Sequence, residues 1–517
     1  DISAGSNGAP ANISVVNNTF TEPGTSVGIS MRRDNATMDV DIRRNKANDI
    51  MYMNHGGANS KMDITATNNT VNATGAAMNF DEIRNAANQS IDVTVRDNII
   101  TKSNIGVQVG APSSTANISF TDNRVLNPDS TRGLNVQADE PNMTADIEIR
   151  NNTVFDGSDR GIETTFNSYN TTANVSLTNN TVDAMTDAVT LFPRGNDQIL
   201  DVDVTNNDLN VTTTGSSRNG LLVAPTGRNS TLAVSAVNNT INSTGRGIDI
   251  DPGYDEGDED DPVDINLDKN VINASTEGVI IEHEAALKQF TDRNVTVSMD
   301  DNVIEAAETG VEMTIENSYG TGNVTLSDNR IDVADYALSF TLNGGEMELN
   351  LTATNNTLTG ENYNGARLTL ADSTAPGSPG TRDVTLSNND VTAGGKGIYL
   401  IADSAPGLSV NFTALDNTVT STGSFEDGIL AELSADRMTV DADVSGNELD
   451  ADGTGLDIET FSDDMNTTLT ASENVVNPGA RIGVALRGGL GTTQNATWRV
   501  SDNSIDQAET GIYLENV

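Results

Sequence analysis

Ile147-Glu148-Ile149-Arg150-Asn151-Asn152-Thr153-Val154 is the stretch that decides the fold. It joins an alternating apolar strand to a turn that ends in Asn, any residue and a branched apolar residue. The second Asn of this phrase recurs along the chain at a mean spacing of about 28.5 residues. A second phrase, Gly-apolar-any-apolar, follows within the same repeat, as in Gly247-Ile248-Asp249-Ile250. Self-similarity at a fixed period of this length predicts a solenoid.

The recurring Asn predicts a column that runs through the whole repeat array. An Asn kept at one register is expected to serve the backbone, because it tolerates the left-handed region and its amide bonds nearby main chain. Asn side chains stacked on successive repeats also bond one another. The residue before the Asn varies between charged residues and Gly, so we expect it to face solvent. The expected ladder consists of Asn18, Asn45, Asn69, Asn98, Asn123, Asn152, Asn180, Asn207, Asn239, Asn270, Asn302, Asn329, Asn356, Asn389, Asn417, Asn447, Asn474 and Asn503.

Each repeat has room for three short strands and no helix. The strand before the Asn alternates with period two, so one of its faces is buried and the other is wet. No repeat can bury its own apolar face, so neighbouring repeats must stack. We therefore predict an all-β, right-handed single-stranded parallel β-helix of about 18 coils. Residues 1–11 form an irregular lead-in and 12–517 one continuous solenoid, with longer loops near 251–263, 281–294 and 371–383.

These motifs resemble those of the right-handed parallel β-helix repeat superfamily, the pectate-lyase-like solenoids. The resemblance rests on the Asn-any-Val/Ile turn and the Gly-Ile-any-Ile strand, and it spans the chain from about Asn12 to Leu514. It implies the fold and leaves the function open, because the superfamily holds pectate lyases, polygalacturonases, phage tailspikes, adhesins and surface-layer-associated proteins.

The strongly negative charge of the chain limits the classes of partner that it can bind. The formal net charge is −47, with 28 Lys and Arg against 75 Asp and Glu, so a nucleic acid is a poor partner. There is no Cys to form disulfides or thiolate metal sites, and no apolar run long enough to span a membrane. Acid spread over all coils favours adaptation to high salt, which screens self-repulsion. An ordinary acidic secreted protein is the alternative.

Two kinds of modification or ligand site are suggested by the residues. The acidic loop carries Asp255, Asp258, Asp260 and Asp261, whose hard oxygen ligands suit Ca²⁺, although a solvated charge run is the simpler interpretation. No other cofactor is expected. Asn-any-Ser/Thr sequons are candidate acceptors of glycans on a surface protein. The acceptors singled out are Asn12, Asn17, Asn117, Asn151, Asn174, Asn238 and Asn411.

No catalytic residue is predicted. The polygalacturonase-like Asn-Thr-Asp, Gly-His-Asp and Arg-Ile-Lys signatures are absent, and with so many acids a pair such as Asp300-Asp301 arises by chance. His55 is expected in a polar turn and His283 at a solvated strand end. The favoured hypothesis is a non-catalytic extracellular structural or adhesive rod at the cell surface, with glycans as further candidate partners. The alternatives are a polysaccharide lyase or hydrolase of the parallel β-helix type, and a viral tail fibre or tailspike.

The ends of the repeat array suggest a partner. The sequence shows no cap over either end of the expected solenoid, and open strand edges invite pairing. We therefore expect the chain to continue into further segments of the same precursor or to join copies of itself end to end in a filament.

Overall fold

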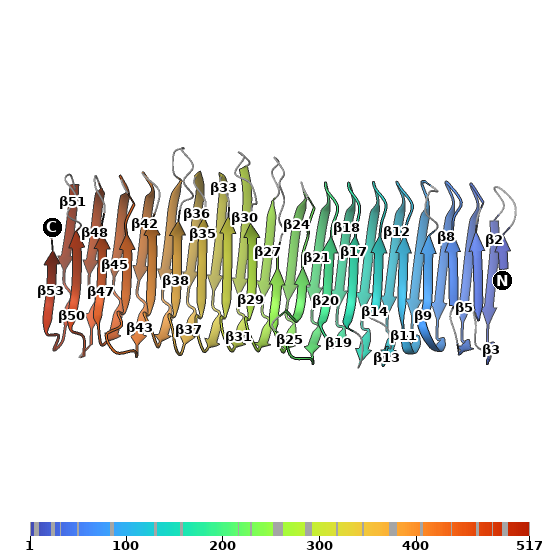
Figure 1. Cartoon of the computed structure of the whole chain (residues 1–517), viewed down its shortest axis with the longest axis horizontal. Coiled ribbons are helices and arrows are strands. Elements are labelled where there is room, and N and C mark those ends of the chain that lie inside the picture. The colour runs from blue at the N-terminus through green and yellow to red at the C-terminus, as the bar shows by residue number, and fades with distance from the viewer. Residues whose placement is uncertain are drawn as a thin grey trace. The chain divides into compact units, whose positions relative to one another are not determined.

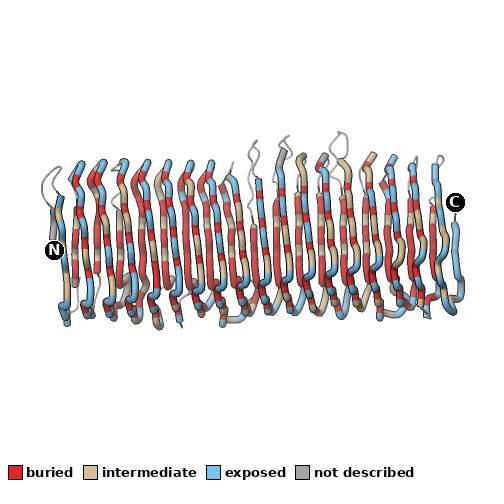
Figure 2. The backbone as a smooth tube through the Cα atoms, turned by 180° about the vertical axis from the view of Figure 1, so that it is seen from behind, coloured by how far each residue is buried: buried red, intermediate tan, exposed pale blue. Residues whose placement is uncertain are grey.

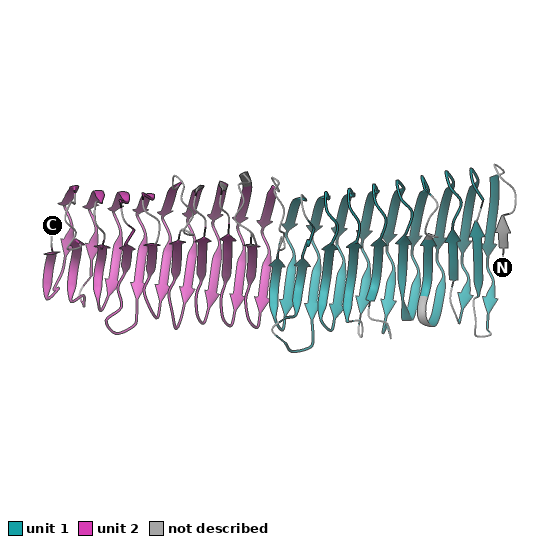
Figure 3. Ribbon diagram, turned by 45° about the horizontal axis from the view of Figure 1, so that its top comes forward, with its two compact units in different colours: residues 1–255 teal, residues 256–517 magenta. Residues whose placement is uncertain are grey.

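The fold is a parallel β-solenoid, which confirms the predicted all-β class. The computed structural model describes residues 2–4, 10–21, 26–31, 33–48, 51–82, 87–128, 132–155, 159–215, 217–227, 230–251, 262–284, 292–316, 319–343, 346–371, 380–403, 407–435, 437–461, 465–477, 479–488 and 495–515. Every element within these ranges is a strand (Figure 1). The chain divides into two compact units, residues 1–255 and 256–517 (Figure 3).

Unit 1 is built from coils of up to three strands. The first strands, which precede the ladder Asn, are β2 (Pro10–Val16), β5 (Thr37–Arg43), β8 (Lys61–Thr67), β10 (Ser90–Arg96), β12 (Thr115–Thr121), β15 (Thr144–Arg150), β18 (Thr172–Thr178), β21 (Ile199–Thr205) and β24 (Thr231–Val237). The second strands, which follow it, are β3 (Thr19–Phe20), β6 (Lys46–Ala47), β13 (Arg124–Leu126), β16 (Thr153–Phe155), β19 (Thr181–Ala184), β22 (Asp208–Val211) and β25 (Thr240–Ser243). The third strands are β1 (Ile2–Ala4), β4 (Val27–Met31), β7 (Met51–His55), β14 (Arg132–Ala138), β17 (Arg160–Phe166), β20 (Asp187–Pro193), β23 (Asn219–Val223) and β26 (Arg246–Ile250). In two coils the second and third strands merge, as β9 (Thr70–Glu82) and β11 (Ile99–Val109).

Unit 2 repeats the same three-strand coil. Its first strands are β27 (Val263–Asp268), β30 (Asp292–Asp300), β33 (Tyr319–Ser327), β36 (Glu346–Thr354), β39 (Thr381–Ser387), β42 (Ser409–Leu415), β45 (Thr439–Ser445), β48 (Asn466–Ser472) and β51 (Asn495–Ser501). Its second strands are β28 (Val271–Ala274), β31 (Val303–Ala306), β34 (Arg330–Val333), β37 (Thr357–Gly360), β40 (Asp390–Ala393), β43 (Thr418–Ser421), β46 (Glu448–Ala451), β49 (Val475–Val476) and β52 (Ser504–Ile505). Its third strands are β29 (Val279–Glu284), β32 (Val311–Glu316), β35 (Leu338–Asn343), β38 (Ala366–Ala371), β41 (Ile398–Asp403), β44 (Ile429–Leu433), β47 (Thr454–Thr460), β50 (Ile482–Gly488) and β53 (Thr510–Glu515).

Neighbouring coils pair in parallel and in register. Strand β15 pairs with β12 on one side and β18 on the other, with Ile147 opposite Ile118 and Val175. Along β15, Ile147 and Ile149 are buried, whereas Asp146 and Glu148, which alternate with them, are exposed. The same alternation of buried and exposed positions recurs along the first strands of both units (Figure 2). Like residues therefore stack in columns, about 4.8 Å apart from coil to coil.

The Gly of the second phrase allows the third strand to approach the next coil. A Cβ at Gly161 would lie 2.1 Å from Val182 Cγ1 and 2.6 Å from the Ala188 carbonyl oxygen. At Gly397 the corresponding contacts are with Val419 Cγ1 at 2.1 Å and the Gly428 carbonyl oxygen at 2.6 Å. Close packing against the branched residue of the following coil, rather than backbone conformation, therefore accounts for this Gly.

Candidate functional site

The Asn column forms a hydrogen-bonded ladder that is buried in both units. In unit 1, the Asn123 side-chain amide donates to Asn152 Oδ1 at 3.0 Å and to the Val95 carbonyl oxygen at 2.7 Å. Asn123 Oδ1 in turn accepts the backbone N–H and the side-chain amide of Asn98, at 3.1 and 3.0 Å. Each such amide bonds two neighbouring coils at once, which is why this position is Asn throughout.

The ladder residues follow the same pattern along each unit. The buried members in unit 1 are Asn45, Asn69, Asn98, Asn123, Asn152, Asn180, Asn207 and Asn239. The buried members in unit 2 are Asn270, Asn302, Asn329, Asn356, Asn389, Asn417, Asn447 and Asn474. Asn503 is half-buried and accepts from Asn474 at 2.9 Å.

The left-handed residue of the turn is the one before the ladder Asn, so the expected left-handed role of the ladder Asn itself is wrong. Asn151 has φ 55° and Asp301 has φ 53°, and both are exposed. Of the eighteen residues at this position, eight are Asn, six are Asp and one is Gly, the types that best tolerate that conformation. The left-handed backbone therefore limits which residue types occur at this position, although the side chain itself faces solvent.

An open groove of about 630 Å³ lies on the outward face of five first strands of unit 1, from β10 to β21. Its carboxylates come from two columns of the sheet, and amides and hydroxyls alternate with them. The polar residues that line it are Asp92, Thr94, Asn117, Ser119, Asp146, Glu148, Asn174, Ser176, Asp201 and Asp203. No aromatic residue lines the groove, so it lacks the platforms on which sugar rings stack.

Neighbours hold several carboxylates of this groove. The Asn117 amide donates to Asp92 Oδ1 at 2.5 Å and the Asn174 amide to Asp146 Oδ1 at 2.7 Å. Lys61 Nζ lies 3.0 Å from Asp92 Oδ2, and its hydrogen bonds to Asp92 and then Asp63 raise the Lys61 pKa. The groove therefore has the character of a hydrated, partly compensated acidic surface.

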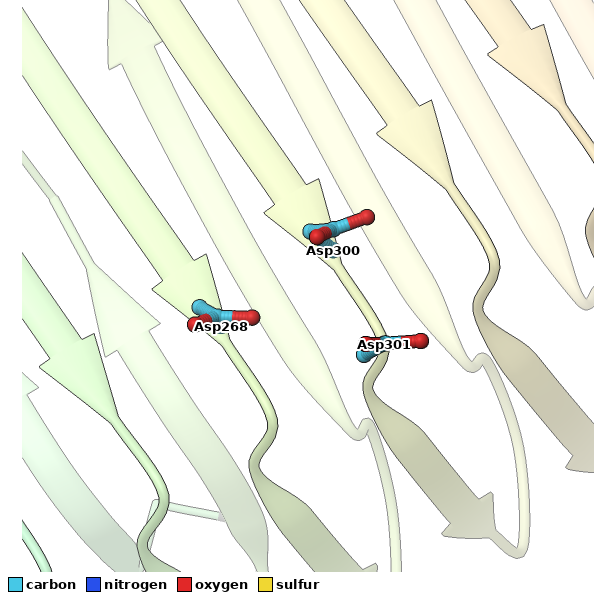
Figure 4. Close-up of side chains that lie close together, drawn as sticks. All are labelled: Asp268, Asp300 and Asp301. Carbon is cyan, nitrogen blue, oxygen red and sulfur yellow. The ribbon is translucent and has the colours of Figure 1, made fainter.

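The four acids proposed for Ca²⁺, Asp255, Asp258, Asp260 and Asp261, lie outside the described residues. In unit 2 the structure instead gathers Asp268, Asp300 and Asp301 (Figure 4), with one carboxylate oxygen of each within 4.8 Å of the others. Lys269 Nζ lies 2.8 Å from Asp268 Oδ1 and 3.7 Å from Asp301 Oδ2. The ammonium group thus lies where a cation would bind.

Sequence reasoning missed this trio because it treated Asp300-Asp301 as a chance pair. The signal was the register between repeats: Asp268 of β27 lies directly opposite Asp300 of β30. Aligning the two repeats on Asn270 and Asn302 places both acids two residues before the ladder Asn. Three carboxylates from adjacent coils can therefore be found from the sequence alone.

The outward faces of the third strands bury charge in unit 1. Glu163 is 2% exposed and lies 2.6 Å from both Arg132 Nε and Arg160 Nη1. Arg160 Nε also lies 3.5 Å from Asp187 Oδ2, and Asp187 Oδ1 accepts the Asn219 backbone N–H at 3.1 Å. Burial raises the pKa of Asp187, although the bonds from Asn219 and Arg160 oppose it. This chain of pairs joins β14, β17, β20 and β23.

Unit 2 carries a second buried acid on the same kind of strand. Asp457 on β47 is 2% exposed, and its Oδ2 lies 3.0 Å from Arg487 Nη2 of β50. Arg487 Nη1 bonds Glu459, two residues along from Asp457. Burial raises the pKa of Asp457 to about 7, against the pull of Arg487. Tyr399 donates to Glu432 Oε2 at 2.7 Å nearby. The face therefore holds two carboxyl groups, Asp457 and Glu459, that share one Arg.

Both histidines are buried, so the expectation that His283 is solvated is wrong. His55 ends β7, and its Nε2 lies 2.7 Å from Ser60 Oγ. Burial lowers the pKa of His55 to about 4, which keeps its ring neutral at pH 7. Inward positions of these two coils therefore accept a polar ring, and neither His faces an exposed groove.

The candidate glycan acceptors fall into two structural groups, all exposed. Asn12, Asn117, Asn174 and Asn411 lie on the outward faces of the first strands β2, β12, β18 and β42. The turn acceptors, which precede ladder residues and have positive φ, are Asn17, Asn151 and Asn238.

The fold and these surfaces define a parallel β-solenoid with acidic outer strand faces. No protein family, no curated protein and no solved structure matches the chain. Among the residues that the structure describes, no helix is long and apolar enough to cross a membrane.

Proposed function

We propose that the chain is a non-catalytic structural or adhesive segment of an extracellular surface assembly. The observation that carries this proposal is the internal pairing of the acids on its outward strand faces. Glu163 is held by Arg132 and Arg160, and Lys269 pairs with Asp268 and Asp301. Groups held in this way stiffen a scaffold, whereas a general base needs a carboxylate that reaches the substrate.

The experiment incubates the protein with pectin, alginate and other uronates, and measures new reducing ends and unsaturated products. A scaffold is expected to release none. Turnover that disappears in the groove variants Asp146→Asn and Glu148→Gln, both of which keep side-chain shape, would contradict the proposal. The variants Asp39→Asn and Asp41→Asn, on the outward face of β5, serve as matched controls.

The extracellular and high-salt parts of the proposal rest on composition and on surface placement. Asp39, Asp63 and Asp92 stack on adjacent strands β5, β8 and β10, and mutual repulsion within such a column is relieved by screening. The exposed turn acceptors Asn151 and Asn238 support glycosylation of the same surface. Intact-glycopeptide mass spectrometry of native material tests this, and unmodified Asn at every acceptor would remove glycosylation from the proposal.

The proposed partner is a further β-coil, from the same polypeptide or a second copy. Each first strand of this chain pairs in parallel and in register with a like strand of a neighbouring coil, as β15 does with β12 and β18. A further coil of the same kind is therefore the partner that this pairing pattern fits. Electron microscopy of native material is expected to show filaments longer than one chain. Isolated single chains with ordered, free ends would contradict this partner.

A further inference from the structure

An aromatic ridge in unit 2 is made by the turns between second and third strands, in a chain where aromatic residues make up only 4%. Tyr336 and Tyr363 stack with ring centroids 5.2 Å apart and planes 17° apart. Tyr363 is 50% exposed, so the stack presents a ring to solvent while Tyr336 holds it in place. Phe425, two coils further on, is 70% exposed.

Phe425 is held in a conformation that its own preferences oppose. Its φ of 67° lies in the left-handed region, and it is the one aromatic residue with such a φ in the described part of the chain. The loop that carries it, residues 422–428, is longer than the turn of the preceding coil, residues 394–397. Arg481 places its guanidinium carbon 5.4 Å from the ring centroid. Strain and exposure of a large apolar ring together point to a binding role.

In the coil between the two rings, three of the four turn residues 394–397 are Gly, and Lys396 is the one side chain longer than a hydrogen. A Cβ at Gly394 would lie 1.9 Å from the Glu361 carbonyl oxygen, and one at Gly395 would lie 2.8 Å from Asn364 Oδ1. These contacts keep both positions as Gly. Since coils stack about 4.8 Å apart, the turns of Tyr363 and Phe425 are separated by roughly 10 Å along the stack, about the length of two sugar units in an extended chain.

The polar groups beside the ridge are already neutralised. Lys396 Nζ lies 3.1 Å from Glu426 Oε2 and 5.4 Å from the Tyr399 ring centroid. Arg481 Nε lies 3.9 Å from Glu509 Oε2. With each of these cations paired and a chain net charge of −47, the ridge offers an anionic ligand no net attraction. Their hydrogen-bonding capacity is still available at the rim.

We infer that the ridge formed by Tyr336, Tyr363 and Phe425 binds a neutral glycan chain. The C–H face of a pyranose ring packs on an aromatic ring, and its hydroxyl groups bond the paired side chains at the edge. The inference rests on the adhesive part of the proposed function and names its ligand class. Two separated rings between polar residues suit a narrow polysaccharide better than the contiguous apolar core of a protein interface.

The test is affinity gel electrophoresis at low and molar NaCl. The neutral polymers are soluble cellulose derivatives, mannan and mixed-linkage glucan, and polygalacturonate is the charged probe. At least one neutral polymer is expected to retard the protein. Tyr363→Ala and Phe425→Asn should each weaken retardation by roughly three- to tenfold, whereas Phe425→Tyr should retain it. Phe155→Ala, which removes an exposed ring from unit 1, is the matched control and should change nothing.

Three outcomes would overturn the inference: no neutral polymer retards the protein, the charged polymer alone retards it, or the ring variants leave retardation unchanged. Phe425→Asn relieves the left-handed strain, so it should fold at least as stably as the parent, and lost binding cannot be assigned to unfolding. Absence of retardation leaves the scaffold proposal standing, because that proposal fails only if polymer is cleaved.

Discussion

The ladder makes its sharpest prediction at two adjacent residues, Asn302 and Asp301. The Asn302 side chain donates to the Leu267 carbonyl oxygen at 2.8 Å and to Asn329 Oδ1 at 2.9 Å. It also accepts the backbone N–H and the side-chain amide of Asn270, at 2.9 and 3.0 Å. Asn302→Ala removes all four bonds in a buried site. At about 1 kcal/mol net for each bond, the expected destabilisation is about 4 kcal/mol.

The neighbouring residue provides a control that is one position away. Asp301 is exposed, and its contact with Lys269 at 3.7 Å contributes little in water. Its backbone is left-handed, with φ 53°. Asp301→Ala should therefore cost only about 1 kcal/mol, the penalty of a Cβ in that region, and Asp301→Gly should cost close to nothing.

Hydrogen exchange followed by mass spectrometry is the appropriate assay, because long repeat arrays need not unfold in one step. A loss of about 4 kcal/mol corresponds to roughly a thousandfold faster exchange, and it should be confined to β27, β30 and β33. Asn302→Asp, which keeps the shape but loses the donor, should behave like Asn302→Ala. The ladder argument is refuted if Asn302→Ala exchanges no faster than Asp301→Ala.

Four further predictions follow from the described side chains. Because burial lowers the pKa of His55 to about 4, stability should fall by up to about 3 kcal/mol as pH drops from 6.5 to 4, and His55→Gln should flatten that part of a pH–denaturation curve. The pH dependence of stability due to Asp457 has the opposite sign. Because the pKa of Asp457 is about 7, the folded state keeps a proton that the unfolded chain releases, so stability should fall by up to about 4 kcal/mol as pH rises from 4 to 7. Asp457→Asn should abolish this loss. Lys269→Met should open the Asp268 trio, so that Ca²⁺ raises the melting temperature of the variant and leaves the parent unchanged. Finally, melting temperature should rise from dilute buffer to molar NaCl; a flat or falling curve would remove the high-salt argument.

The sequence was sufficient for the fold because the residues that decide it are local and repeated. A ladder Asn such as Asn123 is read directly from its spacing, and the inward positions of β15 from their alternation. The left-handed turn position was misassigned by one residue, although its signal was present as the excess of Asn and Asp before the ladder. Charged exceptions such as Arg44 and Lys269 concealed the preference.

The candidate sites were less predictable because they depend on register between coils rather than on any one coil. Asp268 and Asp300 can be aligned, since equal numbers of residues separate them from their ladder Asn. The third strands cannot be aligned in the same way, because the turns that precede them vary in length, as residues 394–397 and 422–428 show. The pairing of Arg487 with Asp457 therefore follows only once the strands are placed.

The contrast between the ladder positions and the turns before the third strands also explains where a solenoid of this kind can vary. A change at a ladder Asn breaks bonds to two coils, so those positions are constrained by stability. The turn before the third strand carries no ladder bond, and its length differs from coil to coil. Phe425 occurs in such a turn, in a longer loop, where its ring is exposed and its backbone is left-handed. A left-handed backbone at an exposed ring costs stability that the ladder does not require, so the glycan test depends on Phe425 rather than on the acidic groove.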